Sequence, residues 1–180
     1  MVILITGASH TGKTLLAQQM LERYHYPYLS MDHLKMGLIR SGNTELTPAD
    51  DEALTPYLWP IVREMMKTAI ENCQHLVVEG CYVPFDWRKD FDEDHLKEIR
   101  FICLAMAGDY VTSHFDEIIA HESDIEVRFV DPGCTVESLI ADNRRYIDGF
   151  LAAGEPVLLI NGDYEEAVGH VWSETDETDL

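Results

Sequence analysis

Short apolar runs alternate along the chain with longer stretches in which apolar and polar residues are mixed at helical spacing. The apolar runs are Val2–Thr6, Pro27–Ser30, His75–Glu79, Ile99–Met106 and Pro156–Ile160. Runs of this length are typical of strands buried on both faces of a parallel sheet. The first mixed stretch, Lys13–His25, repeats its apolar residues about once per helical turn, as Leu16 and Met20 show. We therefore predict that strands and helices alternate.

The segments between the apolar runs divide into helices and turns. Helices are predicted at Lys13–His25, Asp32–Arg40, Thr47–Asn72, Asp109–Ser123, Thr135–Ala153 and Tyr164–Trp172. Pro56 and Pro60 are expected to disturb the early turns of the third helix. Ser30 and Asp32 are both candidates for the N-cap of the second. Residues 80–91 are expected to be irregular, and Asp124–Cys134 to form a loop.

This alternation predicts an α/β fold in which a five-stranded parallel sheet carries helices on both faces. We expect residues 1–172 to form a single domain and residues 173–180 to be an acidic, solvated tail. Ligands on such sheets bind at the carboxyl ends of the strands. Residues that directly follow a strand are therefore the candidates for a functional site.

Charge and composition narrow the classes of partner. The chain has 180 residues and a formal net charge of −20, which argues against a nucleic-acid or anionic-membrane surface. No apolar run approaches the roughly 18 residues of a membrane span, and the first six residues lack the basic segment of a signal peptide. We therefore expect a cytoplasmic protein. The four cysteines have neither disulfide-framework nor zinc-site spacing, and the oligomeric state stays open, a homodimer included.

Residues 7–14, GASHTGKT, match the pattern G-x-x-x-x-G-K-[ST] without a mismatch. A predicted strand precedes the motif and a predicted helix follows it, so that curled backbone amides and the positive helix end can face a phosphate. Lys13 is expected to reach the β- and γ-phosphates, and Thr14 to offer its hydroxyl to Mg²⁺. We therefore predict a site for ATP with Mg²⁺. Its nucleotide-binding residues are Gly7, Ser9, His10, Thr11, Gly12, Lys13, Thr14 and Leu15.

The chain resembles the P-loop kinases in several features taken together. These are its size, the loop close to the N-terminus, an aspartate after the second predicted strand and an arginine-bearing segment before the last one. That superfamily includes nucleoside monophosphate kinases, shikimate and gluconate kinases, chloramphenicol phosphotransferase and the zeta toxins. The resemblance covers most of the chain, and its specific motif is the phosphate loop. It implies an adenylate-kinase-like sheet, a short lid at about residues 124–134, and phosphoryl transfer from ATP to a small molecule.

Two acidic residues lie where chemistry is expected. Asp32 follows the second predicted strand, and a carboxylate there can accept the proton of an attacking hydroxyl or hold a Mg²⁺-bound water. The alternative is that Asp32 only caps its helix. Glu79 ends the third predicted strand and can act on Mg²⁺ through water or on the substrate; the alternative is a surface acid. We predict Thr14, Asp32 and Glu79 as the residues of the metal site, and Lys13 and Asp32 as catalytic.

Arginines are the expected partners of the transferred phosphoryl group, whose charge must be neutralised. Arg128 lies in the predicted lid, and Arg144 and Arg145 follow on the next helix. Adjacent helical residues cannot share one face, so one of that pair is expected to point at the site; we assign Arg128 and Arg145 as catalytic, with Arg128 also binding the nucleotide. The alternative is surface salt bridging with neighbouring acids.

Other candidates are supported by placement alone. By the resemblance, Asn161 after the fifth predicted strand borders the adenine. Arg40, Arg63 and Arg88 are candidates to face an acceptor substrate, against a solvated surface role. His114 and His121, which lie on one helix face, are better explained as solvated than as metal ligands, since no fourth ligand accompanies them.

Three functions are therefore weighed. The first is an ATP- and Mg²⁺-dependent kinase of a small-molecule hydroxyl acceptor, which Asp32 after the second strand favours. The second is a nucleotide kinase or a zeta-toxin-like kinase of a nucleotide sugar. The third is a nucleotide-dependent switch or ATPase; the absence of an N-K-x-D guanine motif weakens it.

Overall fold

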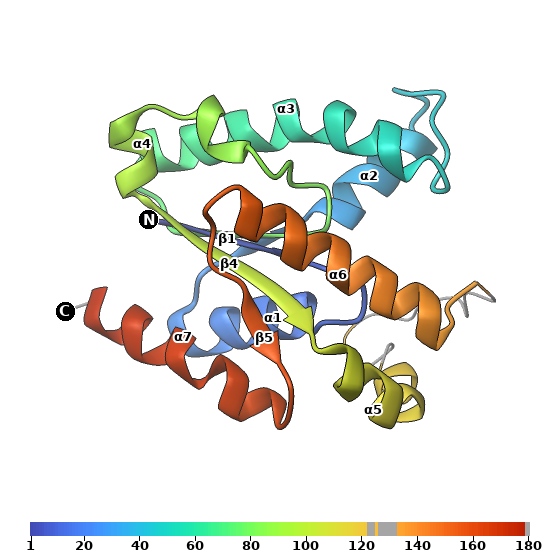
Figure 1. Ribbon diagram of the computed structural model, residues 1–180. Helices are drawn as coiled ribbons and strands as arrows, with labels where there is room; N and C mark the ends of the chain where they lie inside the picture. The colour runs from blue at the N-terminus through green and yellow to red at the C-terminus, as the bar shows by residue number, and fades with distance from the viewer. Residues whose placement is uncertain (122–124, 126–132, 179–180) are drawn as a thin grey trace. The chain divides into compact units, whose positions relative to one another are not determined.

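The computed structural model describes residues 1–121, 125 and 133–178 (Figure 1). Its strands are β1 (Val2–Gly7), β2 (Tyr28–Ser30), β3 (Leu76–Glu79), β4 (Ile99–Met106) and β5 (Leu158–Ile160). Its helices are α1 (Lys13–Tyr24), α2 (Met31–Arg40), α3 (Asp51–Glu71), α4 (Glu93–Lys97), α5 (Gly108–Ala120), α6 (Val136–Ala152) and α7 (Tyr164–Thr178), with a 3₁₀ turn, η1, at Trp87–Asp90.

The five strands form one all-parallel sheet in the order β2-β3-β1-β4-β5, which confirms the predicted fold class. The chain divides into two compact units, which are described separately below. The first unit comprises Met1–Thr6 and Gly12–Ile102, and the second comprises Gly7–Thr11 and Cys103–Leu180. Among the described residues, no helix is both long and apolar enough to cross a membrane.

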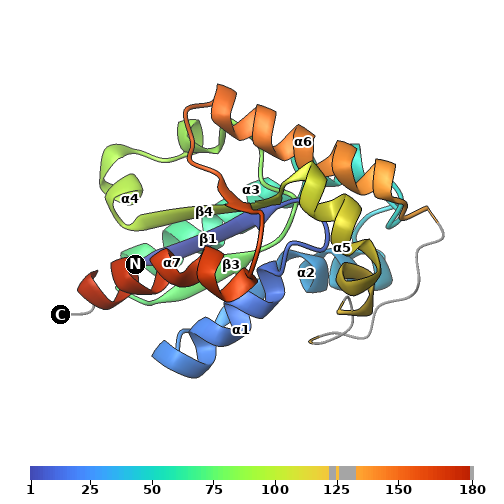
Figure 2. The same ribbon diagram turned by 60° about the horizontal axis from the view of Figure 1, so that its bottom comes forward.

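In the first unit, strand register brings three carboxyl ends to the same level. Ile5 of β1 and Ser30 of β2 both lie opposite Glu79 of β3. The connection from β1 to β2 contains α1, and the connection from β2 to β3 contains α2 and α3. These two connections run in opposite directions across the sheet. Because connections between parallel strands are right-handed, α1 lies on one face of the sheet and α2 and α3 lie on the other. Figures 1 and 2 show this arrangement. Residues that follow β2 and β3 are thereby brought to one edge.

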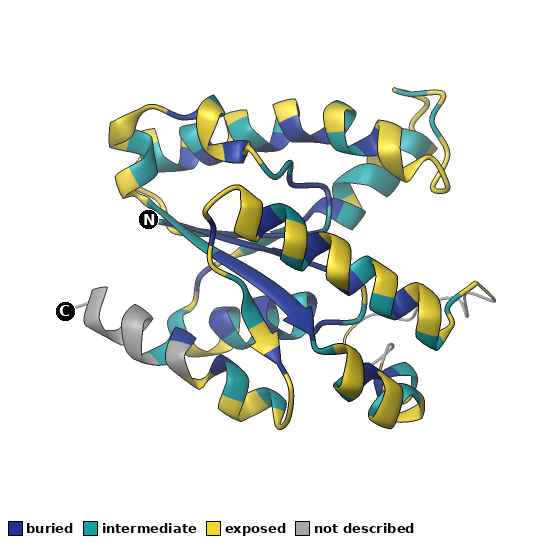
Figure 3. Ribbon diagram, viewed as in Figure 1, coloured by how far each residue is buried: buried dark blue, intermediate teal, exposed yellow. Residues whose placement is uncertain are grey.

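The apolar stripe of α3 explains why this helix tolerates its two prolines. Leu54, Leu58, Val62 and Met66 are fully buried and recur every fourth residue, as the buried bands in Figure 3 show. Pro56 and Pro60 are both exposed, so the carbonyls that lose their amide partners can bond to water. The expected disturbance is therefore absent within α3, which runs unbroken through both positions.

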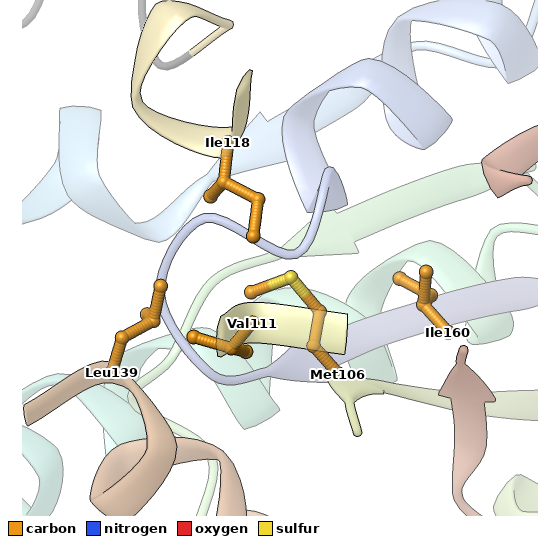
Figure 4. Close-up of a cluster of buried hydrophobic side chains, with 5 residues drawn as sticks. All are labelled: Met106, Val111, Ile118, Leu139 and Ile160. Carbon is orange, nitrogen blue, oxygen red and sulfur yellow. The ribbon is translucent and has the colours of Figure 1, made fainter. Parts of the chain in front are cut away.

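In the second unit, α5 and α6 pack together, and α7 packs on β5. Figure 4 shows an apolar cluster to which β4, α5, α6 and β5 contribute. Its buried members are Met106, Val111, Ile118, Leu139 and Ile160. Helix α6 begins at a reciprocal cap in which Thr135 and Ser138 exchange hydrogen bonds between side chain and backbone.

Several boundaries differ from the sequence prediction. Helix α3 begins at Asp51 rather than Thr47 because the Asp50 carboxylate accepts hydrogen bonds from the amide and hydroxyl of Thr47, both at 2.7 Å, and holds a turn there. Helix α7 continues to Thr178 instead of ending at Trp172, so residues 173–178 are helical and not an irregular tail. The short helix α4 and the turn η1 were not predicted.

Candidate functional site

The backbone of the phosphate loop adopts left-handed conformations at His10 (φ 61°) and Gly12 (φ 77°). Gly12 is also the N-cap of α1. Histidine is among the non-glycine residues that tolerate this region, and turns of this kind direct successive amides into an anion-binding hollow. Since Gly7–Thr11 belong to the second unit and the residues from Gly12 onward to the first, each part is described within its own unit.

In the first unit, the loop's threonine meets the acid at the end of β3. The Thr14 hydroxyl donates to Oε2 of Glu79 at 3.3 Å, and Glu79 is only 2% exposed. Two of the three predicted Mg²⁺ residues, Thr14 and Glu79, are therefore brought together in the first unit, and a metal role for Asp32 stays a prediction. A hydroxyl and a carboxylate are the hard oxygen ligands that Mg²⁺ prefers. These donors fit the ion, with Thr14 as the direct ligand and Glu79 beside it.

Asp32, in the first turn of α2, lies in a chain of polar contacts that the sequence did not predict. Its carboxylate pairs with the Lys35 ammonium at 2.5 Å. Lys35 also donates to the Tyr82 hydroxyl at 2.8 Å and lies over the same ring, 5.0 Å from its centroid. The Tyr82 hydroxyl in turn donates to the Asp51 carboxylate at 3.1 Å. Three separate segments of the first unit therefore position Asp32.

The direction of these hydrogen bonds follows from the chemistry of each group. An ammonium only donates, so the phenol oxygen of Tyr82 accepts from Lys35 and its proton must point to Asp51. Burial, assisted by the nearby charges of Asp32 and Asp51, raises the pKa of Tyr82, which therefore stays protonated. The Lys35 side chain is only 12% exposed, so its ammonium is held in place between Asp32 and Tyr82.

Cys81 of the first unit follows the end of β3 by two residues. Burial raises the pKa of its thiol to about 11. The charges that also act on this thiol are those of Lys13, Asp32, Lys35 and Asp51. The charges of the phosphate-loop lysine and of the predicted catalytic aspartate therefore both act on this thiol. Gly80, just before it, has φ 156°, and a Cβ there would lie 2.6 Å from the Cβ of Met31, so close packing of α2 explains this glycine.

In the second unit, the phosphate loop is tied to helix α6. The Ser9 amide donates to Oδ2 of Asp142 at 2.9 Å. The adjacent Asn143 is buried and accepts from the Met106 amide at 2.6 Å, which anchors α6 to the end of β4. Sequence analysis did not predict this contact between Asp142 and the loop.

The other loop residues of the second unit also make local contacts. The Thr11 hydroxyl donates to the Ala8 carbonyl at 2.8 Å, which closes the loop on itself. Nε2 of His10 lies 3.7 Å from Sγ of Cys134. Gly7 has φ 137°, and a Cβ there would lie 1.9 Å from the Leu104 carbonyl oxygen, so no side chain fits at the first loop position.

Comparison of this architecture with solved structures gives consistent matches over the whole chain. Deoxyadenosine kinase from M. mycoides superposes with a TM-score of 0.58 at 12% identity, covering 98% of this chain and 100% of that one. Shikimate kinase from Bacteroides thetaiotaomicron gives 0.56 at 12% identity, covering 97% and 98%. The fold is that of the P-loop kinases.

A sugar kinase from Janibacter sp. HTCC2649 shares the P-loop kinase fold as well, with a TM-score of 0.54, 16% identity, and coverage of 97% of this chain and 94% of that one. No known protein family matched the sequence, and no curated protein sequence matched it. At such identities the likeness establishes the fold, whereas the chemistry has to be argued from the residues.

The roles predicted for the lid arginines are not tested by the described residues. Arg128 lies outside the described residues. The Arg144 side chain is 81% exposed and lies 3.7 Å from Asp148. The Arg145 guanidinium stacks over the Tyr146 ring at 5.5 Å. The catalytic role of Arg128 and Arg145 therefore stays a prediction.

Two further candidates, Asn161 and His114, were predicted from their position in the sequence alone. Asn161 is exposed directly after β5, and its contact with adenine stays a prediction. His114 stacks on Tyr110 with ring centroids 4.4 Å apart. Within the described part of the chain, no group of three or more His, Cys, Asp or Glu residues could hold a metal ion.

Proposed function

We propose that this protein is an ATP- and Mg²⁺-dependent phosphotransferase that acts on a hydroxyl group of a small molecule. The observation that carries the proposal is the first unit's arrangement of Lys13, Thr14, Glu79 and Asp32 at the carboxyl ends of adjacent parallel strands. A phosphate loop supplies the donor half of such a site, and a carboxylate close to its lysine supplies the acceptor half.

On the donor side, the loop amides and Lys13 bind the β- and γ-phosphates and hold the γ-phosphoryl group in line with the acceptor. Thr14, with Glu79 beside it, would hold Mg²⁺, which supplies positive charge against the phosphate oxygens. The positive end of α1 adds to that charge. Because the transition state spreads negative charge over the transferred group, these fixed positive groups stabilise it more than the ground state.

On the acceptor side, Asp32 accepts the hydrogen bond of the attacking hydroxyl and aligns its oxygen with the γ-phosphorus. The ion pair with Lys35 holds the carboxylate in one orientation before the acceptor arrives. In a loose transition state the hydroxyl proton leaves late, so orientation by Asp32 matters at least as much as proton removal. Arg128 and Arg145 stay the proposed partners of the charge on the transferred phosphoryl group.

Nucleotide kinase activity is the alternative within the same fold. Deoxyadenosine kinase shares the fold, but its acceptor cannot be transferred to this chain from the fold alone. A switch that hydrolyses nucleotide for a protein partner is the alternative outside kinases. The contacts that join Asp32, Lys35 and Tyr82 favour an enzyme that binds an acceptor. A switch would not need a carboxylate held in one orientation by such contacts.

ADP release from Mg·ATP, measured with a panel of hydroxyl and phosphate acceptors, tests the proposal. We expect ADP only with a hydroxyl acceptor, and Asp32→Asn should keep ATP binding while losing about 10²-fold or more of the transfer rate. His33→Asn, at the exposed neighbouring position, is the matched control and should retain activity. Acceptor-independent hydrolysis that only a protein partner stimulates would reject the kinase.

A further inference from the structure

We infer that the acceptor is an uncharged or cationic hydroxyl compound, such as a polyol or an amino alcohol, and not a carboxylate or a phosphate ester. This inference rests on the proposed function and names the substrate class of the same site. The observation behind it is the balance of charge in the first unit around Asp32, where acids outnumber the cations that remain available to a substrate.

The cation closest to Asp32 is already engaged. Lys35 is bonded to Asp32 at 2.5 Å and to the Tyr82 hydroxyl at 2.8 Å, with its side chain only 12% exposed. For this ammonium to bind an anionic acceptor, it would have to release Asp32, the residue that orients the hydroxyl. Lys13, the other cation acting on this region, belongs to the phosphates of ATP.

The acids of the same region are not fully compensated. Asp51 accepts a hydrogen bond from the neutral Tyr82 hydroxyl, and within the described part of the chain no lysine or arginine pairs with it. With Asp32 balanced by Lys35, the carboxylate of Asp51 leaves the acceptor side negative, which repels an anion and attracts a cation.

The arginines that could have offered an anion site in the first unit are placed elsewhere. Arg63 donates to Asp90 at 3.0 Å. Arg88 stacks over Trp87, with its guanidinium carbon 4.9 Å from the ring centroid. Arg40 is exposed at the far end of α2, eight residues and about 12 Å along the helix from Asp32. Arg63 and Arg88 are thus engaged by Asp90 and Trp87, and Arg40 lies about two helical turns from Asp32.

Cys81 provides a probe of this charge that needs no substrate, because its thiol is acted on by Asp32, Lys35 and Asp51. Its thiolate attacks the sulfenyl sulfur of a methanethiosulfonate reagent, forming a disulfide and releasing methanesulfinate. The rates with a trimethylammonium-ethyl and a sulfonatoethyl reagent are measured at pH 9 by site-resolved mass spectrometry. Their ratio at Cys81, divided by the ratio for free 2-mercaptoethanol, reports the local charge.

Because the Lys13 charge also acts on this thiol when ATP is absent, this normalised ratio is measured in Lys13→Met protein, where we expect it to favour the cationic reagent by about tenfold. Asp51→Asn should lower it and Lys35→Met should raise it, whereas Asp116→Asn, an exposed acid on α5, should leave it unchanged. A normalised ratio at or below one would overturn the inference. Because the reaction requires neither ATP nor transfer, this readout stands even if the proposed kinase activity fails.

The second measurement uses matched acceptors that differ in charge: glucosamine, glucose and gluconate, and serinol, glycerol and glycerate. With Mg·ATP, ADP release should be at least about tenfold faster for the neutral or cationic members than for the carboxylates. A preference for a carboxylate would overturn the inference and leave the kinase standing. Loss of ATP binding itself would instead reject the proposed function. If ATP binds and no member reacts, the Cys81 ratio decides.

Discussion

Replacing Lys35 by methionine removes the ammonium that holds Asp32 and keeps the length of the buried stem. At an effective dielectric constant of about 20, two unit charges at the observed 2.5 Å attract each other by about 7 kcal/mol. Most of this attraction is offset by the desolvation of Lys35 and by water at Asp32, whose side chain is 37% exposed. Together with the lost hydrogen bond to Tyr82, we expect the free energy of unfolding to fall by about 2 kcal/mol.

The assay is urea unfolding followed by circular dichroism for wild type, Lys35→Met, Asp32→Asn and the double variant. The cycle should give a coupling energy of about 1–2 kcal/mol between the two side chains. Lys97→Met is the matched control, because Lys97 also pairs with an acid three residues away, at 2.7 Å, but both side chains are exposed. Its unfolding midpoint should not change measurably.

If Lys35→Met costs no more than Lys97→Met and the coupling energy is zero, then Lys35 does not hold Asp32. That result would also contradict the proposed acceptor side, because the orientation of Asp32 and the unavailability of Lys35 to an acceptor both depend on this ion pair. Lys35→Arg should recover part of the lost stability, since it restores the charge with a different shape.

Three further changes test the phosphate loop. Gly7→Ala should lower the free energy of unfolding in urea by more than about 3 kcal/mol, because the added Cβ would lie 1.9 Å from a backbone carbonyl oxygen. Gly162→Ala is the control and should lower it little, since a Cβ there meets open space. Equal losses would show that the loop packs differently. Asp142→Asn keeps an oxygen for the Ser9 amide and removes a negative charge beside the phosphates, so calorimetry should show ATP binding about threefold to tenfold tighter, and weaker binding would contradict this. In Thr14→Val, the factor by which Mg²⁺ increases the affinity for ATP should fall about 10- to 100-fold, whereas the affinity for metal-free ATP should be nearly unchanged.

The strand pattern could be predicted because parallel strands are apolar throughout. Strand β4 was predicted at Ile99–Met106 to the residue, and its last five residues are buried. The short elements could not be predicted in this way, since α4 spans only five residues and buries none of them. Helix α7 extends past Trp172 although Ser, Thr and Asp are weak helix formers and negative charge is disfavoured at this end of a helix, so propensity did not predict its last six residues.

The contact between Thr14 and Glu79 could be predicted, because the carboxyl ends of neighbouring parallel strands share one edge. The contacts of Tyr82 and Asp142 could not. Asp142 reaches the Ser9 amide across 133 residues of sequence, and no local pattern specifies which acid of α6 faces the loop. The pairing of Asp32 with Lys35 did have a signal, since opposite charges three residues apart share a helix face.

The most direct test of the proposed phosphotransferase is ³¹P NMR of the protein with Mg·ATP and a hydroxyl acceptor found in the panel. The account predicts that the γ-phosphate resonance is replaced by that of a phosphate monoester in equal amount to the ADP formed. This conversion should be lost in Lys13→Ala, which lacks the loop ammonium. Inorganic phosphate as the sole product, at a rate independent of acceptor, would contradict the account.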